Sequence, residues 1–509
     1  MSSPFSRTLP PHPDLDQQKT QAKELLTSFT AGDVDALARV RTVLPDKRRI
    51  ALADAHFVLA REYGFDDWAA LKQHIESTGA STMSPLQRMH DAFSRCDTKL
   101  LRLLFECHAE FRAQIDAPLF DFNAPAIVAF ANHRDMVDVL LDFGADPNRR
   151  SEWWAGGFHA LHSATGEAAE RLIAGGAIPD ACAAAHLDRV DLLERILDAD
   201  PTRVHERGGD GQTPLHFATS RAVIDLLISA GADVDARDLD HRATAAEWML
   251  DHTRGSGRYD LARYLVERGA SADIFLAAAL GLTDRALAML EAQPELLDLR
   301  TGQGVYGERP PSSYHIYLWT IGESRTPLDV AAQFEQRETL DRMLAFTSPR
   351  QRLLLACRQG DDVAAKMLLR DHPGTIATMT ANDHRAITDA AWNGDAGAVA
   401  LMLDLGFDPR TPGHDLGTAL HCAAWQGLSD MVATLLRHPD ARSIVAMRDA
   451  HHGATPLGWC CHGSRFGNTS RDHAGVARLL LEAGSPPEPE TADASPLVSA
   501  VLAAWRRSA

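Results

Sequence analysis

Cysteine is scarce in this chain, with 7 residues among 509. The number is odd, the positions are scattered, and no two cysteines form a C-x-x-C pair. Small secreted proteins framed by disulfides are shorter and far richer in cysteine, so that class is excluded. Cys422, between Leu420 and Ala424, stands where a small apolar helix residue belongs. We therefore expect reduced thiols, most of them buried, in a cytoplasmic protein.

Long apolar runs and basic charge are also lacking. No stretch approaches the ~18 apolar residues that a membrane-spanning helix needs, and the proline-rich first 14 residues hold no apolar segment of the kind found in secretory signals. Lys and Arg number 51 against 69 Asp and Glu, which gives a formal charge of −18. Nucleic-acid backbones are bound by dense basic charge. We therefore expect neither a membrane nor a nucleic acid as partner.

What the sequence does contain is a repeat of about 33 residues. Three segments, 356–360, 390–394 and 423–427, align without gaps, and their glycines are 34 and 33 residues apart. A second signature, Thr-Pro-Leu-His or a variant of it, begins at Thr213, Thr326, Thr418 and Thr455. A third signature, Gly-Ala-Asp or a variant of it, begins at Gly144, Gly231, Gly269 and Gly406.

Each signature has a local physical role. Threonine is a good N-cap, because its hydroxyl accepts a backbone N–H of the first turn. Proline at the next position has its φ preset and no N–H to lose, and glycine at the far end supplies the left-handed residue that stops a helix. Two such short helices cannot bury a core alone, whereas stacked copies bury a continuous one. The pattern predicts an all-α solenoid of helix-turn-helix units.

The Thr213–Ala218 string (T-P-L-H-F-A), the period and the Gly231–Asp235 closure (G-A-D-V-D) resemble the ankyrin-repeat family. The resemblance covers residues 84–490. It implies an ankyrin solenoid with hairpin-like turns, in which the motif histidines His216 and His421 tie neighbouring units together. It also implies protein binding through the concave face and the loops.

The two ends differ from the array. Residues 1–14 are expected to be disordered, and residues 15–79 to form a helical N-terminal segment. That segment resembles the leader found ahead of the repeats in many bacterial ankyrin-repeat proteins, and we expect it to cap the first repeat. Residues 491–509 are expected to form a C-terminal capping helix, because an open end of a solenoid exposes apolar surface.

Three insertions interrupt the period, at 251–258, 301–325 and 463–474. The long one at 301–325 has four aromatic residues among 25, or 16% against 6% for the whole chain. Aromatic residues on loops are favoured interface anchors. Two interpretations stay open: the rings fold back to plug the junction between repeats, or they form a protrusion that binds a partner.

Two stretches of the sequence contain residue types found in cofactor or metal sites. Gly302-x-Gly304-x-x-Gly307 matches a dinucleotide fingerprint but lacks the strand before it and the helix within it, so we expect no cofactor. Residues 451–473 hold a cluster of soft and imidazole ligands: His451, His452, Cys460, Cys461, His462 and His473. Their spacing is that of neither a zinc finger nor an i, i+4 helix pair. A metal-dependent or hydrolytic enzyme built on this segment is therefore the alternative function rather than the first.

The first hypothesis is a non-catalytic scaffold that binds a protein partner, and we expect it to be a monomer. No catalytic residue, cofactor or metal is predicted. Binding energy at interfaces concentrates in a few aromatic residues. The predicted partner-binding residues are two in the Gly-rich unit and four in the long insertion: Trp153, Trp154, Tyr306, Tyr314, Tyr317 and Trp319.

Overall fold

The computed structural model describes Phe5, Arg7, Leu9 and residues 15–72, 74–75, 84–250, 258–487 and 493–508. Within these ranges the chain is all α, with three isolated bridges and no strand, and no helix is long and apolar enough to cross a membrane. The chain divides into two compact units, residues 1–117 with 133–146 and residues 118–132 with 147–509. The predicted disordered segment 1–14 and insertion 251–258 lie outside the described residues, except for Phe5, Arg7, Leu9 and Arg258.

The first unit begins with helices that fold around a core of their own. Its helices are α1 (Leu15–Thr30), α2 (Val34–Val43), α3 (Leu52–Glu62), α5 (Pro85–Ser94), α6 (Thr98–Cys107), α7 (Ala109–Arg112) and α9 (Arg134–Asp142). Helices α1, α2 and α3 bury Leu25, Val40 and Leu59 between them. Arg39 donates two hydrogen bonds of 2.8 Å to the buried carboxylate of Glu62 and so ties α2 to the end of α3.

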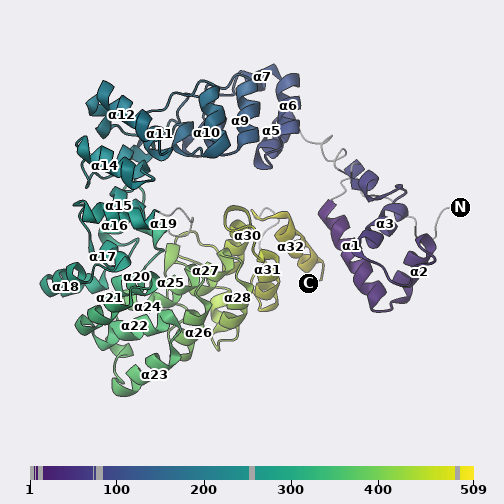
Figure 1. The fold of residues 1–509 in the computed structure, drawn as a ribbon. Coiled ribbons are helices and arrows are strands. Elements are labelled where there is room, and N and C mark those ends of the chain that lie inside the picture. The colour runs from purple at the N-terminus through teal and green to yellow at the C-terminus, as the bar shows by residue number, and fades with distance from the viewer. Residues whose placement is uncertain are drawn as a thin grey trace. The chain divides into compact units, whose positions relative to one another are not determined.

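The second unit is a series of paired short helices, which Figure 1 shows from teal to yellow. The pairs are η2 (Ala160–His162) with α10 (Gly166–Ala174), α11 (Ala181–His186) with α12 (Val190–Ala199), α13 (Pro214–Phe217) with α14 (Arg221–Ser229), α15 (Ala245–Trp248) with α16 (Tyr259–Glu267), α17 (Ile274–Leu280) with α18 (Thr283–Ala292), α20 (Pro327–Gln333) with α21 (Arg337–Met343), α22 (Pro349–Gln359) with α23 (Asp362–Asp371), α25 (Ala386–Trp392) with α26 (Ala396–Asp404), α27 (Ala419–Trp425) with α28 (Ser429–Leu436), and α30 (Pro456–Phe466) with α31 (His473–Glu482). This arrangement confirms the predicted solenoid.

Shorter helices and one terminal helix complete the second unit. They are η1 (Asp121–Asn123), α8 (Ala126–Ala129), η3 (Pro201–His205), η4 (Gly209–Gly211), η5 (Pro294–Asp298), η6 (Gly304–Tyr306), α19 (Tyr317–Thr320), η7 (Leu344–Phe346), η8 (Ile376–Thr378), α24 (Ala381–His384), η9 (His414–Leu416), α29 (Ala441–Val445) and α32 (Pro496–Ser508). Helix α32 packs on the last repeat through the buried side chains of Val498 and Leu502. It lies within the predicted C-terminal segment 491–509.

The threonine-histidine signature joins one repeat to the next. The Nδ1 atom of His216 accepts the backbone N–H of Thr213 at 3.1 Å. With Nδ1 an acceptor, Nε2 carries the proton and donates to the carbonyl of Ala243 in the following unit at 3.0 Å. His421 repeats this arrangement between Thr418 and Ala454, at 3.1 and 3.2 Å. These hydrogen bonds form the link between neighbouring units that the family resemblance implied.

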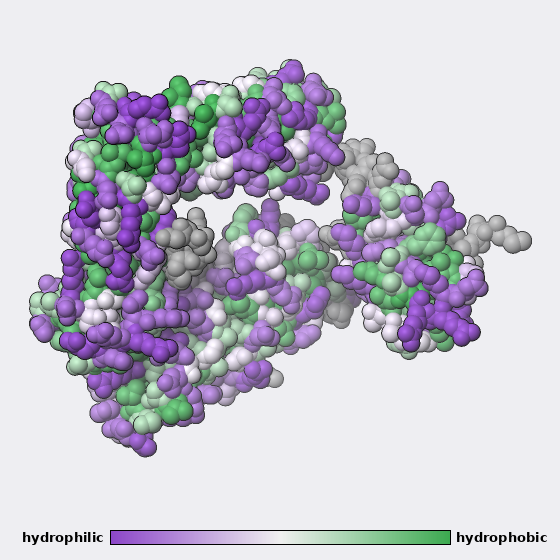
Figure 2. Space-filling view, in the orientation of Figure 1, coloured by the Kyte–Doolittle hydropathy of each residue, from purple (hydrophilic) through white to green (hydrophobic). Residues whose placement is uncertain are grey.

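Apolar side chains between the helices form two extended cores in the second unit, one from Ala181 to Leu355 and one from Leu353 to Leu502. A fully buried leucine such as Leu265 or Leu420 contributes about 1.5–3 kcal/mol. Five of the seven cysteines are buried, whereas Cys96 is half-buried and Cys107 is exposed. Polar residues cover much of the face that Figure 2 presents, as expected when each short helix turns its apolar stripe toward its neighbours.

The insertion 301–325 folds back on the preceding repeats. Tyr317 is fully buried and Tyr306 is 8% exposed, and both rings pack edge-on against Phe275 of α17. Their hydroxyls donate to the two oxygens of Asp273 at 2.8 and 2.9 Å. Buried rings present no surface to a partner, so the prediction that Tyr306 and Tyr317 bind one is corrected: they attach the insertion to the core.

The predicted insertion 463–474 begins later than expected, because α30 continues to Phe466. Gly463 does not stop the helix. A Cβ at this position would lie 2.3 Å from the carbonyl oxygen of Trp425. Glycine is required here because α30 and α27 approach each other closely, which brings their tryptophans together at the site described next.

Candidate functional site

The remaining predicted contact residues are Trp153, Trp154 and Tyr314, which lie outside helices, and Trp319 in the short helix α19. Trp154 is 45% exposed and Trp319 is 53% exposed, and Trp319 lies edge-on to the ring of His241, 4.7 Å away. Trp153 is half-buried and packs edge-on against Phe122. Tyr314 is half-buried, and its carbonyl accepts a hydrogen bond from His241. Only Trp154 and Trp319 of the six therefore present large apolar surface to solvent.

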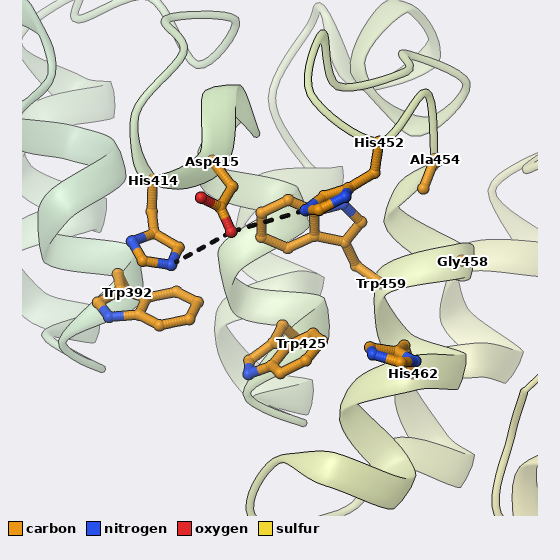
Figure 3. A pocket seen from close by; sticks show the side chains of 9 residues that line it. All are labelled: Trp392, His414, Asp415, Trp425, His452, Ala454, Gly458, Trp459 and His462. Carbon is orange, nitrogen blue, oxygen red and sulfur yellow. Dashed lines mark ion pairs between the residues drawn. The ribbon is translucent and has the colours of Figure 1, made fainter. Parts of the chain in front are cut away.

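A cleft of about 370 Å³ lies elsewhere, at the tips and first helices of three later repeats. Figure 3 shows its lining, which consists of Trp392, His414, Asp415, Trp425, His452, Ala454, Gly458, Trp459 and His462. Three of these side chains are indoles. Trp392 and Trp425 belong to the aligned repeat segments 390–394 and 423–427 and were not among the predicted site residues. The signal was present: both end the first helix of a unit, in consecutive Ala-Ala-Trp strings.

The fold holds the three indoles at different depths. Trp459 of α30 is 5% exposed and donates its indole N–H to Asp449 at 2.9 Å. Trp425, at the end of α27, is half-buried and lies edge-on to Trp459, with ring centroids 6.2 Å apart. Trp392, at the end of α25, is half-buried and stacked on His414 at 3.7 Å. Indole faces and edges are thus available to a ligand in the cleft.

Charged groups sit at the edge of the cleft on the tip that contains η9. Asp415 lies 3.7 Å from Nε2 of His414 and 3.7 Å from Nε2 of His452, the two ion pairs dashed in Figure 3. Its carboxylate is half-exposed. The Nδ1 atom of His414 is 3.0 Å from the carboxylate of Glu323. One carboxylate, that of Asp415, therefore lines the cleft, and Glu323, outside the lining, is hydrogen-bonded to the imidazole of His414.

The ionisation of His414 follows from these neighbours. Burial disfavours the imidazolium, but the hydrogen bond to Glu323 and the charges of Glu323 and Asp415 outweigh it and raise the pKa of His414 above its ordinary value. The protonated form of His414 is thus paired mainly with Glu323, and Asp415 remains the half-exposed acidic group facing the aromatic walls.

The alternative function is not favoured by the positions of its residues. Cys460 is buried, and its Sγ donates to the carbonyl of His473 at 3.2 Å. Burial raises the pKa of the Cys460 thiol well above its ordinary value, so the nucleophilic thiolate is disfavoured. His473 is buried and bonds through Nε2 to the carbonyl of Trp425 at 2.9 Å. His451, His452 and His462 lie at the surface.

Comparison with known proteins places part of this array in a known family. The family model described as Ankyrin repeat matches residues 210–239. A mouse protein, Ankyrin repeat and SAM domain-containing protein 6, is 33% identical over 120 residues, which are 23% of this chain and 13% of that protein. The Arabidopsis thaliana Serine/threonine-protein kinase VIK is 42% identical over 57 residues, 11% of this chain and 13% of that protein. The chain thus spans about an eighth of the length of either relative.

Among solved structures, the human ASB11 ankyrin repeat domain is 18% identical, covers 54% of this chain and 100% of its own, and has a TM-score of 0.25. The family match at 210–239 coincides with the unit whose Thr213 and His216 make the bond to the next repeat. Further units repeat the same helix pair and the same caps. The chain therefore contains an ankyrin repeat at residues 210–239, and the further units share its helix pair and caps.

Proposed function

We propose that this chain is a non-catalytic scaffold whose aromatic cleft takes a positively charged side chain, arginine or lysine, of a protein partner. Ankyrin repeats are a protein-protein interaction module, which makes a protein the expected partner class. The observation that carries the proposal is the presence of three indoles and the half-exposed carboxylate of Asp415 around one cleft. Indole faces attract cations, and a nearby carboxylate supplies the opposite charge.

The volume of the cleft and the net charge of the chain also support a basic side chain as the occupant of the cleft. A volume of about 370 Å³ lies within the range of small-ligand pockets, roughly 300–1,000 Å³, and accepts one long side chain with part of its backbone. The chain carries a formal charge of −18, so a basic segment is attracted to it at long range. Arginine is the better fit, because its planar guanidinium stacks on aromatic rings and pairs with a carboxylate at the same time.

The test is a titration of the full chain with a short peptide that contains one arginine, against the same peptide with citrulline. Citrulline keeps the shape and removes the charge. We expect the arginine peptide to bind and quench tryptophan fluorescence, and the citrulline peptide to bind at least ~10-fold more weakly. Asp415→Asn is expected to reduce this discrimination. Equal binding of the two peptides, or no change on Asp415→Asn, would contradict a cation site.

Several finer expectations belong to the same proposal. We place the protein in the cytoplasm, as a monomer that does not bind nucleic acid, on the strength of its free cysteines and acidic balance. The exposed Trp154 and Trp319 are proposed as secondary contacts of the same partner. Light scattering of the purified chain and a gel shift at low salt, where binding to nucleic acid is strongest, check the oligomeric state and the absence of that ligand.

A further inference from the structure

A second group of polar side chains lies at two successive loop tips, separate from the aromatic cleft. It consists of Asp210 on one tip and Asp240 and His241 on the next, all buried. One ligand atom from each residue lies within 4.8 Å of the other two. Nε2 of His241 is 3.9 Å from Asp210 Oδ2 and 3.7 Å from Asp240 Oδ2. These distances exceed those of a hydrogen bond, about 2.7–3.2 Å for a nitrogen donor.

Asp210 is the unexplained member of the group. Its residue is 6% exposed, and its Oδ1 atom is buried without a hydrogen-bond partner among the described residues. Two other buried carboxylates near this group are fully bonded: Asp273 accepts from two tyrosines, and Asp180 accepts from Arg150 and His162. Farther along the unit, Asp389 also has one oxygen without a partner. A buried carboxylate oxygen without a hydrogen bond is costly, since its desolvation is not repaid. The other oxygen, Oδ2, lies 3.9 Å from the imidazole of His241, and the side chain also interacts with the indole of Trp153.

The other two residues are oriented by the insertion 301–325. Asp240 accepts the backbone N–H of Ser313 at 2.9 Å and its hydroxyl at 3.1 Å. Nδ1 of His241 donates to the carbonyl of Tyr314 at 2.9 Å, so Nε2 is the ring nitrogen that faces the two carboxylates. Metal-binding histidines are commonly held in this way, by a bond from the far ring nitrogen to a carbonyl. Trp319 covers the ring of His241.

The charged side chains next to this group are hydrogen-bonded to other atoms. Arg242, on the same tip, donates to the carbonyls of Gly307 and Ser313. The carboxylate of Asp238 accepts two backbone N–H groups of its own tip and the indole N–H of Trp248. What remains is one imidazole nitrogen and two carboxylates that converge on a space shielded by the insertion.

We propose that Asp210, Asp240 and His241 bind a divalent transition-metal ion, such as Zn²⁺, that fastens the insertion 301–325 to the loop tips. One imidazole and two carboxylates suit Zn²⁺ or Mn²⁺, whereas Ca²⁺ and Mg²⁺ favour sets of oxygen ligands. Ligand atoms about 2.1 Å from a tetrahedral zinc lie about 3.4 Å apart, so the present separations of 3.7 and 3.9 Å require only a small contraction.

The experiment uses the full chain, freed of metal with a chelator, and titrates it with ZnCl₂ and in parallel with CoCl₂. We expect one ion per chain to bind tightly, with the visible d–d absorption of Co²⁺ and no thiolate charge-transfer band. Asp210→Asn should weaken Zn²⁺ binding at least ~100-fold, because loss of an outer-shell partner alone costs about 10–100-fold. Zn²⁺ should raise the unfolding temperature of the parent chain and not that of the variant.

The matched control is Cys182→Ser in the neighbouring group His162, Asp180 and Cys182, whose ligand atoms also lie close together. Asp180 in that group is already bonded to Arg150 and His162, so Cys182→Ser should leave Zn²⁺ binding unchanged. His241→Gln is the second variant if Asp210→Asn lowers the helix content. Equal Zn²⁺ affinity in the parent and the Asp210 or His241 variant would overturn the proposal. So would a thiolate band that Cys182→Ser removes, or no tight Zn²⁺ binding by the parent.

Discussion

Two parts of the array share several side chains at equivalent positions, yet one is closed and the other is open. Three residues before the cap threonine stands Asp210 in the first and Asp415 in the second, and each faces a histidine of the next tip, His241 or His452. Six residues before the next threonine stands Asp238 or Asp449.

A tryptophan completes both copies. The indole N–H of Trp248 donates to Asp238 at 2.9 Å, and that of Trp459 donates to Asp449 at 2.9 Å. The motif histidines His216 and His421 make equivalent bonds to the next unit. The two copies are thus one framework used twice.

The surroundings differ in two respects. The insertion 301–325 contacts His241 of the first copy, in which Asp210 and His241 are buried, whereas Asp415 and His452 are exposed. The second copy has Trp425 seven residues after its threonine, where the first has Ser220. The same aspartate-histidine pair therefore becomes a shielded group with metal ligands in one case and the edge of an aromatic cleft in the other. Coverage by the insertion and several exchanged side chains decide the chemistry, since Asp240 and Gly209 of the first copy are replaced by His451 and His414 in the second.

The largest loss of stability is expected from a substitution that weakens the attachment of the insertion 301–325. Tyr317→Ala leaves a cavity under the insertion and takes a bond from buried Asp273. Loss of a large buried ring costs about 3–5 kcal/mol. Guanidinium unfolding followed by circular dichroism measures it. Tyr317→Phe, which keeps the ring, should cost only about 1–3 kcal/mol. Equal, small losses in both variants would contradict a core role.

Acid should weaken the link between repeats in the open copy. Burial lowers the pKa of His421 to about 4, because the imidazolium is desolvated. The unfolded histidine has a pKa near 6.5 and binds protons first as the pH falls. Stability from this residue is therefore full above about pH 6.5 and is lost as the pH falls toward 4, by about 3 kcal/mol in total.

Urea unfolding at a series of pH values between 7 and 4.5 checks this effect in the parent and in His421→Asn. The variant should be less stable at pH 7, because two buried bonds are lost, and should lose less further stability on acidification. If both proteins showed the same pH dependence, His421 would not be the responsible group.

Making the open copy more like the closed one should abolish binding. Trp425→Ser gives the second copy the residue type of Ser220 and removes one aromatic wall. Loss of a hot-spot tryptophan costs about 2 kcal/mol or more, so affinity for the arginine peptide should fall at least ~30-fold. Isothermal titration measures it, with Trp425→Phe expected to retain much of the affinity. An unchanged affinity of Trp425→Ser for the arginine peptide would show that the peptide binds elsewhere.

The smallest effect is expected at Trp154, which is exposed and lies outside the cleft lining. Trp154→Ala should change the free energy of unfolding by no more than about 0.5 kcal/mol and weaken peptide binding less than about threefold. The same titration and unfolding experiments measure both. A large loss of binding here, with little change for Trp425→Ser, would favour the loop tips over the cleft.

Much of the fold was predictable because its signals are local. Thr213 and Thr418 start helices, the glycine at 360 ends one, and leucines at helical spacing mark the buried faces, so the period alone predicts stacked helix pairs. The boundary at Gly463 was wrong, since that glycine serves a contact with Trp425 in another helix. The sequence left open whether Tyr306 and Tyr317 project toward a partner or fold back, because an aromatic loop has the same composition in both cases.

The sequence by itself determined the repeat, its caps and the histidine links, because these depend on residues within about one unit of each other. It also placed the aromatic residues that distinguish one tip from another. Only the tertiary structure decided which of them are exposed. Asp240 and Ser313 are joined by an insertion that reaches back over the preceding tips, and the stacking of repeats brings Trp392 and His452 to one cleft. Such contacts depend on three-dimensional packing between distant segments, and no local spacing encodes them.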